Sequence, residues 1–401
     1  MSPQSKGPRP TTKTVRAGID RDTAFGAVTP PLVLSSNFSF ESFGKKRRYD
    51  YTRSGNPTRD GLAEALAERE GGAGAVVTST GLSAITLVLN ALLSPGDKLV
   101  VPHDAYGGSW RLFDALARKG HFEVVTADLT QPENVVRALA CRPKLALFET
   151  PSNPLLRITD LAHACAAARE VGALSIVDNT FLSPALQNPL ALGADLVVHS
   201  TTKYINGHSD VVGGAVIAAD AGLAEKLTWW ANALGLTGAP FDSFLTLRGL
   251  RTLDARMRVH EENARAIAAL LEAHPAVKKV YYPGLTNHVG HALAARQQAG
   301  FGGMLSVELA GGAAAVRTFV GALQHFTLAE SLGGVESLVA HPASMTHASM
   351  SAEARATAGI SDGLVRLSVG IEALEDLALD LEAALSSTFS RKGKSVQWRF
   401  S

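Results

Sequence analysis

Two residues that follow apolar segments could do chemistry together: the amine of Lys203 and the carboxyl of Asp178. Lys203 comes after an apolar run and a cluster of hydroxyls within residues 197–204, and Asp178 ends a second apolar run at residues 173–177. If both runs are neighbouring parallel strands, both groups lie at the carboxyl edge of the sheet, where open α/β sheets bind ligands. An amine that forms a Schiff base, with an acid to hold a pyridinium nitrogen, is the pairing that pyridoxal 5′-phosphate (PLP) requires. A surface lysine and a turn aspartate are the alternative, which the hydroxyls beside Lys203 disfavour.

Three further segments could bind anions. Residues 78–84 end a predicted strand and open a helix at a glycine, and free backbone N–H groups at such a point suit a phosphate, although an ordinary capped turn has the same pattern. Arg53, in the polar loop 49–58, could hold a phosphate bidentately or could be a solvated loop arginine. Arg366, on the predicted strand 364–369, needs an anion, which is a substrate carboxylate or a structural salt bridge.

Two more side chains could act on a substrate. Tyr106 stands before paired glycines in residues 103–109 and could lie flat over a planar ring, or could simply cover the core as a turn aromatic. Glu330 is an acid in an apolar context, residues 327–334, and could set substrate preference or pair with a local base. The histidines lack further ligands at metal-binding spacing, so we expect no metal site.

Apolar runs alternate with helical patterns after about residue 61, which predicts an α/β fold with a large, doubly wound, mainly parallel sheet. Its strands are expected at residues 74–78, 99–101, 145–148, 174–177, 196–198 and 213–217, with helices at 110–118 and 161–170. A different order of elements after about residue 250 predicts a smaller C-terminal α+β domain. Its elements are expected to be a helix at 255–273, strands at 280–282, 304–309 and 365–369, and helices at 314–322 and 375–385.

We therefore expect three parts: an N-terminal arm (residues 1–60), a large PLP-binding domain (61–255) and the C-terminal α+β domain (256–401). The arm is rich in Pro, Gly, Ser and Arg without sustained periodicity, so it is either disordered or packs against another subunit. The tail from residue 390 is expected to be mobile.

Composition narrows the class of protein. The 401 residues are 46% hydrophobic and 19% charged, with a net charge of +1, which indicates a globular enzyme and argues against nucleic acid or an anionic membrane as partner. Cys141 and Cys165 are too few for a disulfide framework, and the first sixteen residues contain no apolar stretch of the secretory type. These features predict a cytoplasmic location and no membrane association.

From about residue 14 to 385, these motifs and their order resemble the Cys/Met-metabolism family of PLP enzymes, the transsulfuration group of fold type I, aminotransferase-like transferases. The runs that carry most of the resemblance are residues 51–53, 150–154, 178–180 and 200–204. Residues 181–190 and 229–232 resemble the bacterial members that catalyse γ-replacement. The resemblance implies a homotetramer, a dimer of dimers whose arms complete the sites of neighbouring subunits.

The resemblance also implies a role for each motif residue around PLP. Lys203 would carry the cofactor as a Schiff base, Asp178 would pair with the pyridinium nitrogen, and Tyr106 would stack on the ring; Tyr106 or Lys203 would be the catalytic base. The phosphate would be held by Gly81, Leu82, Ser200 and Thr202, joined by Tyr51 and Arg53 from a neighbouring subunit. Thr180 and Asn153 would flank the cofactor.

An amino-acid substrate would be bound beside the cofactor. Its α-carboxylate end would lie at Arg366 and Ser331, and its distal part would be lined by Glu330, Asp50, Arg111 and Asn232. The implied activity is γ-replacement in methionine biosynthesis, converting O-succinyl-L-homoserine and L-cysteine to L-cystathionine and succinate. The alternative is γ-elimination of cystathionine to cysteine, 2-oxobutanoate and ammonia, which uses the same motifs. A PLP-binding regulator without turnover is a remote alternative, unsupported by any basic surface or helix-turn-helix segment.

Three positions bear on which of the family's activities the sequence implies. Gly108 stands where methionine γ-lyases carry a reactive cysteine, which argues against that activity. Leu82 replaces the methionine of many members, and γ-lyases share this leucine. Glu330 suits γ-synthases and γ-lyases and disfavours β-lyases. The acetyl or succinyl nature of the ester and any allosteric control remain open at this stage.

Overall fold

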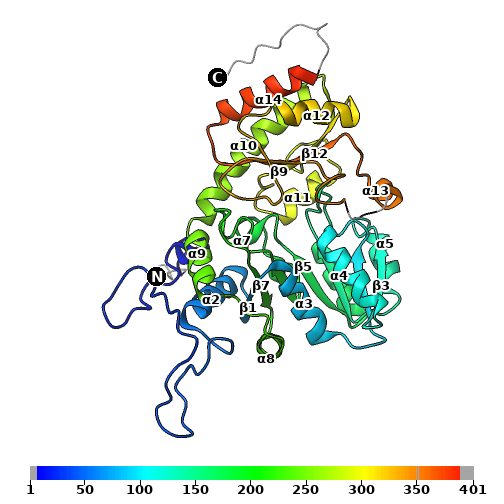
Figure 1. Ribbon diagram of the computed structural model, residues 1–401. Helices are drawn as coiled ribbons and strands as arrows, with labels where there is room; N and C mark the ends of the chain where they lie inside the picture. Colours follow the sequence, from blue (N-terminus) through cyan, green and yellow to red (C-terminus); the bar gives the residue numbers. More distant parts are fainter. Residues whose placement is uncertain (1–6, 349, 351, 389–401) are drawn as a thin grey trace, which may run out of the picture.

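The computed structural model describes residues 7–348, 350 and 352–388, and its two β-sheets lie in successive parts of the chain (Figure 1). The large sheet has seven strands in the order β1-β7-β6-β5-β4-β2-β3. These strands are β1 (Gly74–Thr78), β2 (Lys98–Pro102), β3 (Glu123–Ala127), β4 (Leu145–Glu149), β5 (Leu174–Asp178), β6 (Leu196–His199) and β7 (Gly214–Ala218). The fold class predicted from the sequence is confirmed.

The central strands of the large sheet are parallel, and β7 alone pairs antiparallel, with β1 on one side and β6 on the other. The run expected at residues 213–217 does close the sheet, as this antiparallel strand. The edge strand β3 was missed, because its residues are either exposed or half-buried and so form no buried apolar run. The other expected strands of this sheet are confirmed, with ends shifted by a residue or so.

Helices cover both faces of the large sheet. Alternate residues of β2 show the two layers: Leu99 and Val101 pack with α3, α4 and α8, while Val100 packs with α5 and α6 on the other face. The helices of this half are α2 (Pro57–Glu70), α3 (Gly81–Leu92), α4 (Gly107–Arg118), α5 (Pro132–Leu139), α6 (Leu161–Glu170), α7 (Ser183–Leu186), α8 (Ala221–Leu234) and α9 (Pro240–Leu250), with a 3₁₀ turn at Pro189–Leu192. This double covering explains the near-continuous apolar strands.

The start of α2 shows how local sequence sets a helix boundary. The Asn56 side chain accepts hydrogen bonds from the backbone N–H groups of Thr58 and Arg59, and Pro57 occupies the first helical position, where no N–H is needed. Gly71 ends the helix in the left-handed region at φ 79°.

The smaller sheet has the order β10-β11-β12-β9-β8 and is covered on one face by α10, α12 and α14 (Figure 1). Its strands are β8 (Val277–Tyr281), β9 (Met304–Leu309), β10 (Thr327–Leu328), β11 (Leu338–Ala340) and β12 (Leu364–Ser368). The helices of this half are α10 (Leu253–Ala273), α11 (His291–Gln297), α12 (Gly312–Ala322), α13 (Ala352–Ala358) and α14 (Leu374–Thr388). The expected strands and long helices are confirmed within a few residues, whereas β10, β11, α11 and α13 were not anticipated. The tail expected to be mobile lies outside the described residues.

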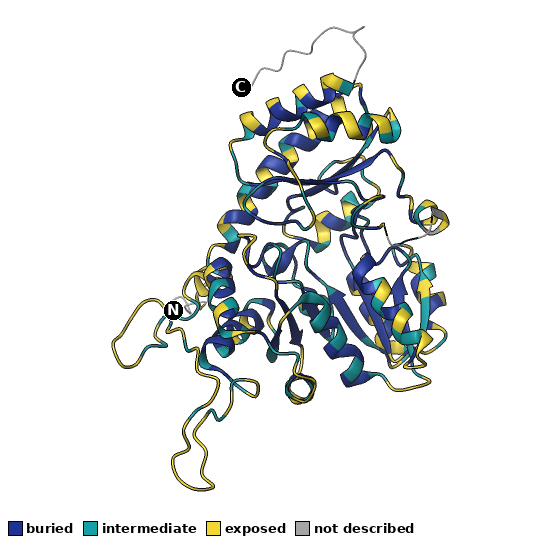
Figure 2. Cartoon of the chain, viewed as in Figure 1, coloured by how far each residue is buried: buried dark blue, intermediate teal, exposed yellow. Residues whose placement is uncertain are grey.

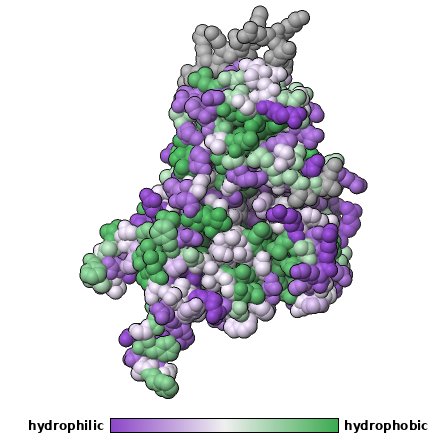
Figure 3. Space-filling model, in the orientation of Figure 1, coloured by the Kyte–Doolittle hydropathy of each residue, from purple (hydrophilic) through white to green (hydrophobic). Residues whose placement is uncertain are grey.

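In the described part of the N-terminal arm, the short helix α1 (Pro10–Val15) is followed by two long loops that project from the body before α2 begins at Pro57 (Figure 2). Large apolar side chains lie open on these loops: Phe25 is 92% exposed and Phe43 is fully exposed. The space-filling view shows apolar residues out to the tips of the projecting loops (Figure 3). Exposed apolar groups of this size are typical of surfaces that another chain covers.

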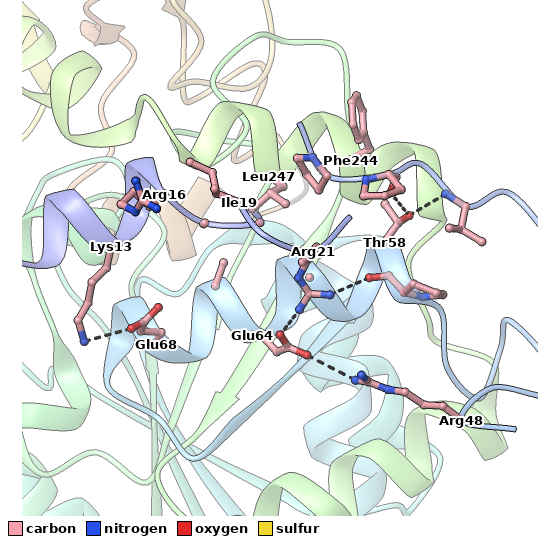
Figure 4. A pocket seen from close by; sticks show the side chains of 18 of the residues that line it. Lys13, Arg16, Ile19, Arg21, Arg48, Thr58, Glu64, Glu68, Phe244 and Leu247 are labelled. Atoms are coloured by element: carbon pink, nitrogen blue, oxygen red, sulfur yellow. Dashed lines mark hydrogen bonds and ion pairs between the residues drawn. The ribbon is translucent and has the colours of Figure 1, made fainter. Parts of the chain in front are cut away.

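A hollow of about 790 Å³ lies between the arm, α2 and α9 (Figure 4). Its basic side chains are already paired: Lys13 Nζ lies 3.1 Å from Glu68 Oε1, and Arg21 and Arg48 both contact Glu64. Such exposed pairs contribute only about 0–1 kcal/mol each, and here they tie the arm to α2. Within the described part of the chain, no helix has the length and hydrophobicity needed to cross a membrane.

Candidate active site

A second cavity, of about 460 Å³, lies at the carboxyl ends of β4, β5 and β6 and is bordered on the side of the small sheet by residues 330–332 and by Arg366 of β12. Of the residues named from the sequence, it is lined by Gly81, Leu82, Tyr106, Asn153, Asp178, Thr180, Ser200, Thr202, Lys203, Glu330, Ser331 and Arg366. The sheet edge at which the Lys203 and Asp178 side chains were expected to meet is therefore the floor of one cavity.

The Lys203 amine is the reactive group of this cavity. Its Nζ donates a hydrogen bond to Ser331 Oγ at 2.6 Å. Burial and the charge of the nearby Arg366 guanidinium together lower the pKa of Lys203 to about 8, while Glu330 acts in the opposite direction. A neutral, nucleophilic amine is therefore accessible near neutral pH.

The Asp178 carboxyl lies at the end of β5, where Oδ1 accepts the backbone N–H of Thr180 at 3.0 Å. Burial raises the pKa of Asp178, whereas the hydrogen bonds from Thr180 and the charge of His199 favour the ionised form. Thr180 Oγ1 in turn accepts the backbone N–H of Ser200 at 2.9 Å, so β5 and the segment after β6 hold one another in place.

The start of α3 forms an anion-binding wall. Thr80 caps the helix by accepting the Ser83 N–H at 2.8 Å, which leaves the N–H groups of Gly81 and Leu82 free at the cavity. A Cβ on Gly81 would lie 2.8 Å from the Ser200 Cβ, so glycine allows this close approach. A helix start next to hydroxyl side chains fits a phosphate group.

Arg366 brings a buried positive charge to the cavity from β12. Its Nη1 donates to Asn153 Oδ1 at 3.1 Å and its Nη2 to the Ser331 carbonyl at 2.8 Å, while Nε has no partner among the described residues. Burial lowers the pKa of Arg366 to about 10, against the effect of Glu330. None of the ion pairs in the described chain involves Arg366, so its charge is available to an anionic ligand. Ser331 itself has φ 81°, a conformation that costs about 1–3 kcal/mol and that is common at functional sites.

Five residues named from the sequence do not line this cavity. Tyr51 is half-exposed on the arm, and Arg53 Nη1 donates to the carbonyl and the Oδ1 of Asn232, at 2.7 and 3.0 Å. Asp50 accepts from Ser54 and lies near Lys46. Arg111 is exposed on α4. The resemblance assigned Tyr51 and Arg53 to the site of a neighbouring subunit, so their roles, and those of the other three, stay predictions for a single chain.

Sequence reasoning missed two acids and a histidine next to the floor. Glu149 ends β4 directly beside Asp178 in the strand register, and burial together with the charge of Asp178 raises its pKa well above the usual value. His199 also faces the cavity, and its Nε2 lies 2.6 Å from Glu70 Oε1, with both side chains fully buried. The signal for Glu149 was present, because it ends an apolar run exactly as Asp178 does; nothing local distinguished Glu70.

This fold and this site define a PLP-dependent enzyme of fold type I. Residues 11–386 match the model of the Cys/Met metabolism PLP-dependent enzyme family, and the chain belongs to this family. Cystathionine gamma-synthase of Escherichia coli (strain K12) is 60% identical over 371 residues, covering 92% of this chain and 96% of the relative. A cystathionine beta-lyase of Lactococcus lactis subsp. cremoris is 48% identical over 374 residues, covering 93% and 98%.

Solved structures agree with the sequence relatives. The crystal structure of cystathionine gamma synthase from Xanthomonas oryzae pv. oryzae in complex with cystathionine is 74% identical, with a TM-score of 0.94, and covers 95% of this chain and 98% of that one. At this identity the match extends to the whole described architecture. The cofactor of the family is PLP, which the amine, the acid and the helix start described above fit.

Proposed function

We propose that the chain catalyses γ-replacement, converting O-succinyl-L-homoserine and L-cysteine to L-cystathionine and succinate. The observation that carries the proposal is the convergence in one cavity of the half-buried Lys203 amine, the half-buried Asp178 carboxyl and the buried Arg366, which has no ion-pair partner among the described residues. The relatives named as γ-synthases are 60% and 74% identical to this chain, whereas the relative named as a β-lyase is 48% identical. The higher identity to the γ-synthases supports this choice of reaction.

The cofactor would be held by the residues that line the cavity. Lys203 would hold PLP covalently, Asp178 would face its ring nitrogen, Tyr106 would cover the ring, and Thr180 and Asn153 would flank it. The N–H groups of Gly81 and Leu82 with the hydroxyls of Ser200 and Thr202 would hold the phosphate. Bound PLP supplies an electron sink for the negative charge that develops when a proton leaves the substrate carbon.

The substrate would be oriented by its α-carboxylate. Arg366 and Ser331 would bind this group at the small-sheet side of the cavity, and Glu330 would face the distal part of the substrate. Lys203 Nζ, which is released when the amino acid binds, would take the Cα proton and return it later, since its pKa of about 8 suits both directions near neutral pH. Succinate leaves from Cγ with its bonding electrons, and the cysteine sulfur forms the new bond to Cγ as it loses its proton.

The assembly belongs to the same proposal: a cytoplasmic homotetramer built as a dimer of dimers. The exposed apolar side chains on the arm and the absence of Tyr51 and Arg53 from the cavity of their own chain support arms that reach neighbouring sites. Asp50, Arg111 and Asn232 would then line the distal end of a composite site. We keep the division into an arm (1–60), a large domain (61–255) and a C-terminal domain (256–401), which the two separate sheets support.

An end-product assay tests the proposal against the competing γ-elimination. The purified chain with PLP is given O-succinyl-L-homoserine with and without L-cysteine, and separately cystathionine alone. We expect cysteine-dependent formation of cystathionine together with succinate. Release of 2-oxobutanoate from cystathionine as the faster reaction would instead assign γ-elimination, and pyruvate from cystathionine would assign β-elimination. Repeating the assay with the acetyl ester identifies the preferred leaving group.

A further inference from the structure

Glu149 is a second acid in the floor of the cavity, and its carboxyl group binds the backbone of two separate segments. It is the last residue of β4, is half-buried and lines the cavity. Its Oε2 accepts the backbone N–H of Tyr106 at 3.0 Å, and its Oε1 accepts the backbone N–H of Asn153 at 3.2 Å. One carboxyl group therefore joins two segments separated by more than forty residues of chain.

Both segments line the proposed cofactor site. Tyr106 is the residue before α4, its side chain is 42% exposed, and no side chain caps this helix start. The Tyr106 carbonyl accepts the Trp110 N–H at 2.9 Å within the helix start, and the bond from its own N–H to Glu149 ties this start to the end of β4. Asn153 in turn accepts a hydrogen bond from Arg366, so a displacement of Asn153 would also move the arginine.

We propose that Glu149 is a positioning residue, which fixes the wall that carries Tyr106 and the wall that carries Asn153 by one carboxyl oxygen each. The inference rests on the proposed PLP site, because it concerns the spacing of the walls between which the cofactor ring would lie. Glu149 does not itself need to touch the reacting atoms.

Two substitutions of Glu149 remove different numbers of its hydrogen-bond acceptors. Glu149 lies beside Asp178 in the sheet register, and burial and this like charge both raise its pKa. The N–H groups of Tyr106 and Asn153 act in the opposite direction, because both stabilise the ionised carboxylate of Glu149. A Glu149→Gln change removes one of the two hydrogen-bond acceptors, since an amide NH₂ cannot accept. Glu149→Ala removes both.

The test measures hydrogen exchange and PLP binding on the full-length chain. Backbone exchange is followed by mass spectrometry in peptides that span Tyr106 and Asn153, with the cofactor removed. PLP affinity is then measured by absorbance as the cofactor is added back. Asp195→Asn is the matched control, because Asp195 Oδ2 accepts the N–H of Ser175 at 2.8 Å at the opposite edge of the same sheet.

We expect Glu149→Ala to lose protection in both peptides and to bind PLP about tenfold or more weakly, as expected when two hydrogen bonds are lost. Glu149→Gln should lose protection mainly in one peptide, with a smaller loss of affinity, and the kcat of the loaded enzyme should fall more than KM rises. Asp195→Asn should leave both peptides and the affinity unchanged.

Two results separate the failure of this inference from the failure of the proposed function. If the wild-type chain does not bind PLP, the proposed cofactor site itself is wrong. If the wild-type chain binds PLP and Glu149→Gln, folded by circular dichroism, shows unchanged exchange at both segments and unchanged affinity, Glu149 is not a positioning residue. A Glu149→Ala chain that fails to fold leaves the decision to the Gln variant.

Discussion

Replacing Lys203 with methionine should make the PLP-free chain more stable, because the amine is buried at a cost. Its pKa in the fold is about 8, against an unperturbed 10.5. At about 1.36 kcal/mol per pKa unit this difference corresponds to about 3 kcal/mol. Loss of the hydrogen bond to Ser331 offsets about 1 kcal/mol, so we expect Lys203→Met to raise the free energy of unfolding by about 2 kcal/mol at pH 7.

The stability difference between the two chains should depend on pH in a defined direction. Below pH 8 the amine is protonated in both states, and the fold carries the full cost of a buried charge. Between the two pKa values the unfolded chain binds more protons, so the stability of the wild type rises with pH. The advantage of the methionine variant should therefore be complete below about pH 8 and should disappear towards pH 10.5.

The assay is thermal or chemical unfolding of both PLP-free chains at pH values from about 6.5 to about 10, in steps of about one pH unit. Lys226→Met, at an exposed position on α8, is the control and should show no pH-dependent difference from the wild type. A Lys203→Met chain whose stability difference is negligible, or does not change with pH, would refute the buried amine and with it the accessible neutral nucleophile.

Three further predictions concern binding and assembly. Arg366→Ala should lower kcat/KM by about 10²-fold or more in steady-state kinetics, because charge-assisted hydrogen bonds to the α-carboxylate are lost. A decrease below about threefold would exclude this role of Arg366. Asp178→Asn should weaken PLP binding in an absorbance titration of the cofactor-free chain, and wild-type affinity would show that the acid does not face the ring nitrogen. Arg53→Ala and Lys203→Ala chains should each be inactive alone, and mixing them should restore part of the turnover after subunit exchange, because a hybrid then contains a site with both residues intact. If verified hybrids recover no turnover, Arg53 does not act in the neighbouring site.

The sequence located the floor of the site because of a general property of parallel sheets. Lys203 and Asp178 follow apolar runs, and strands that pair in parallel bring such residues to one edge. Glu149 obeys the same rule but was missed, because it matters only once β4 is known to pair with β5 in register. The contact between Glu70 and His199 joins residues 129 positions apart, which no local pattern reveals.

The upper part of the site was less predictable from local pattern. Alternation on the strand at Arg366 indicated a buried guanidinium, but the choice between a salt bridge and a free charge needed the three-dimensional neighbours of the arginine. The edge strand β3 was missed because it lacks a continuous apolar run. The roles proposed for Tyr51 and Arg53 need a second chain, so neither the sequence pattern nor one folded subunit tests them.

The most direct measurement of the central claim is the identification of the lysine that binds PLP. The purified chain is incubated with PLP, treated with borohydride to make the attachment permanent, and digested for peptide mass spectrometry. The account predicts a yellow protein that loses its colour on reduction and carries the pyridoxyl group on Lys203. A protein that stays colourless, or a modification confined to another lysine, would contradict it.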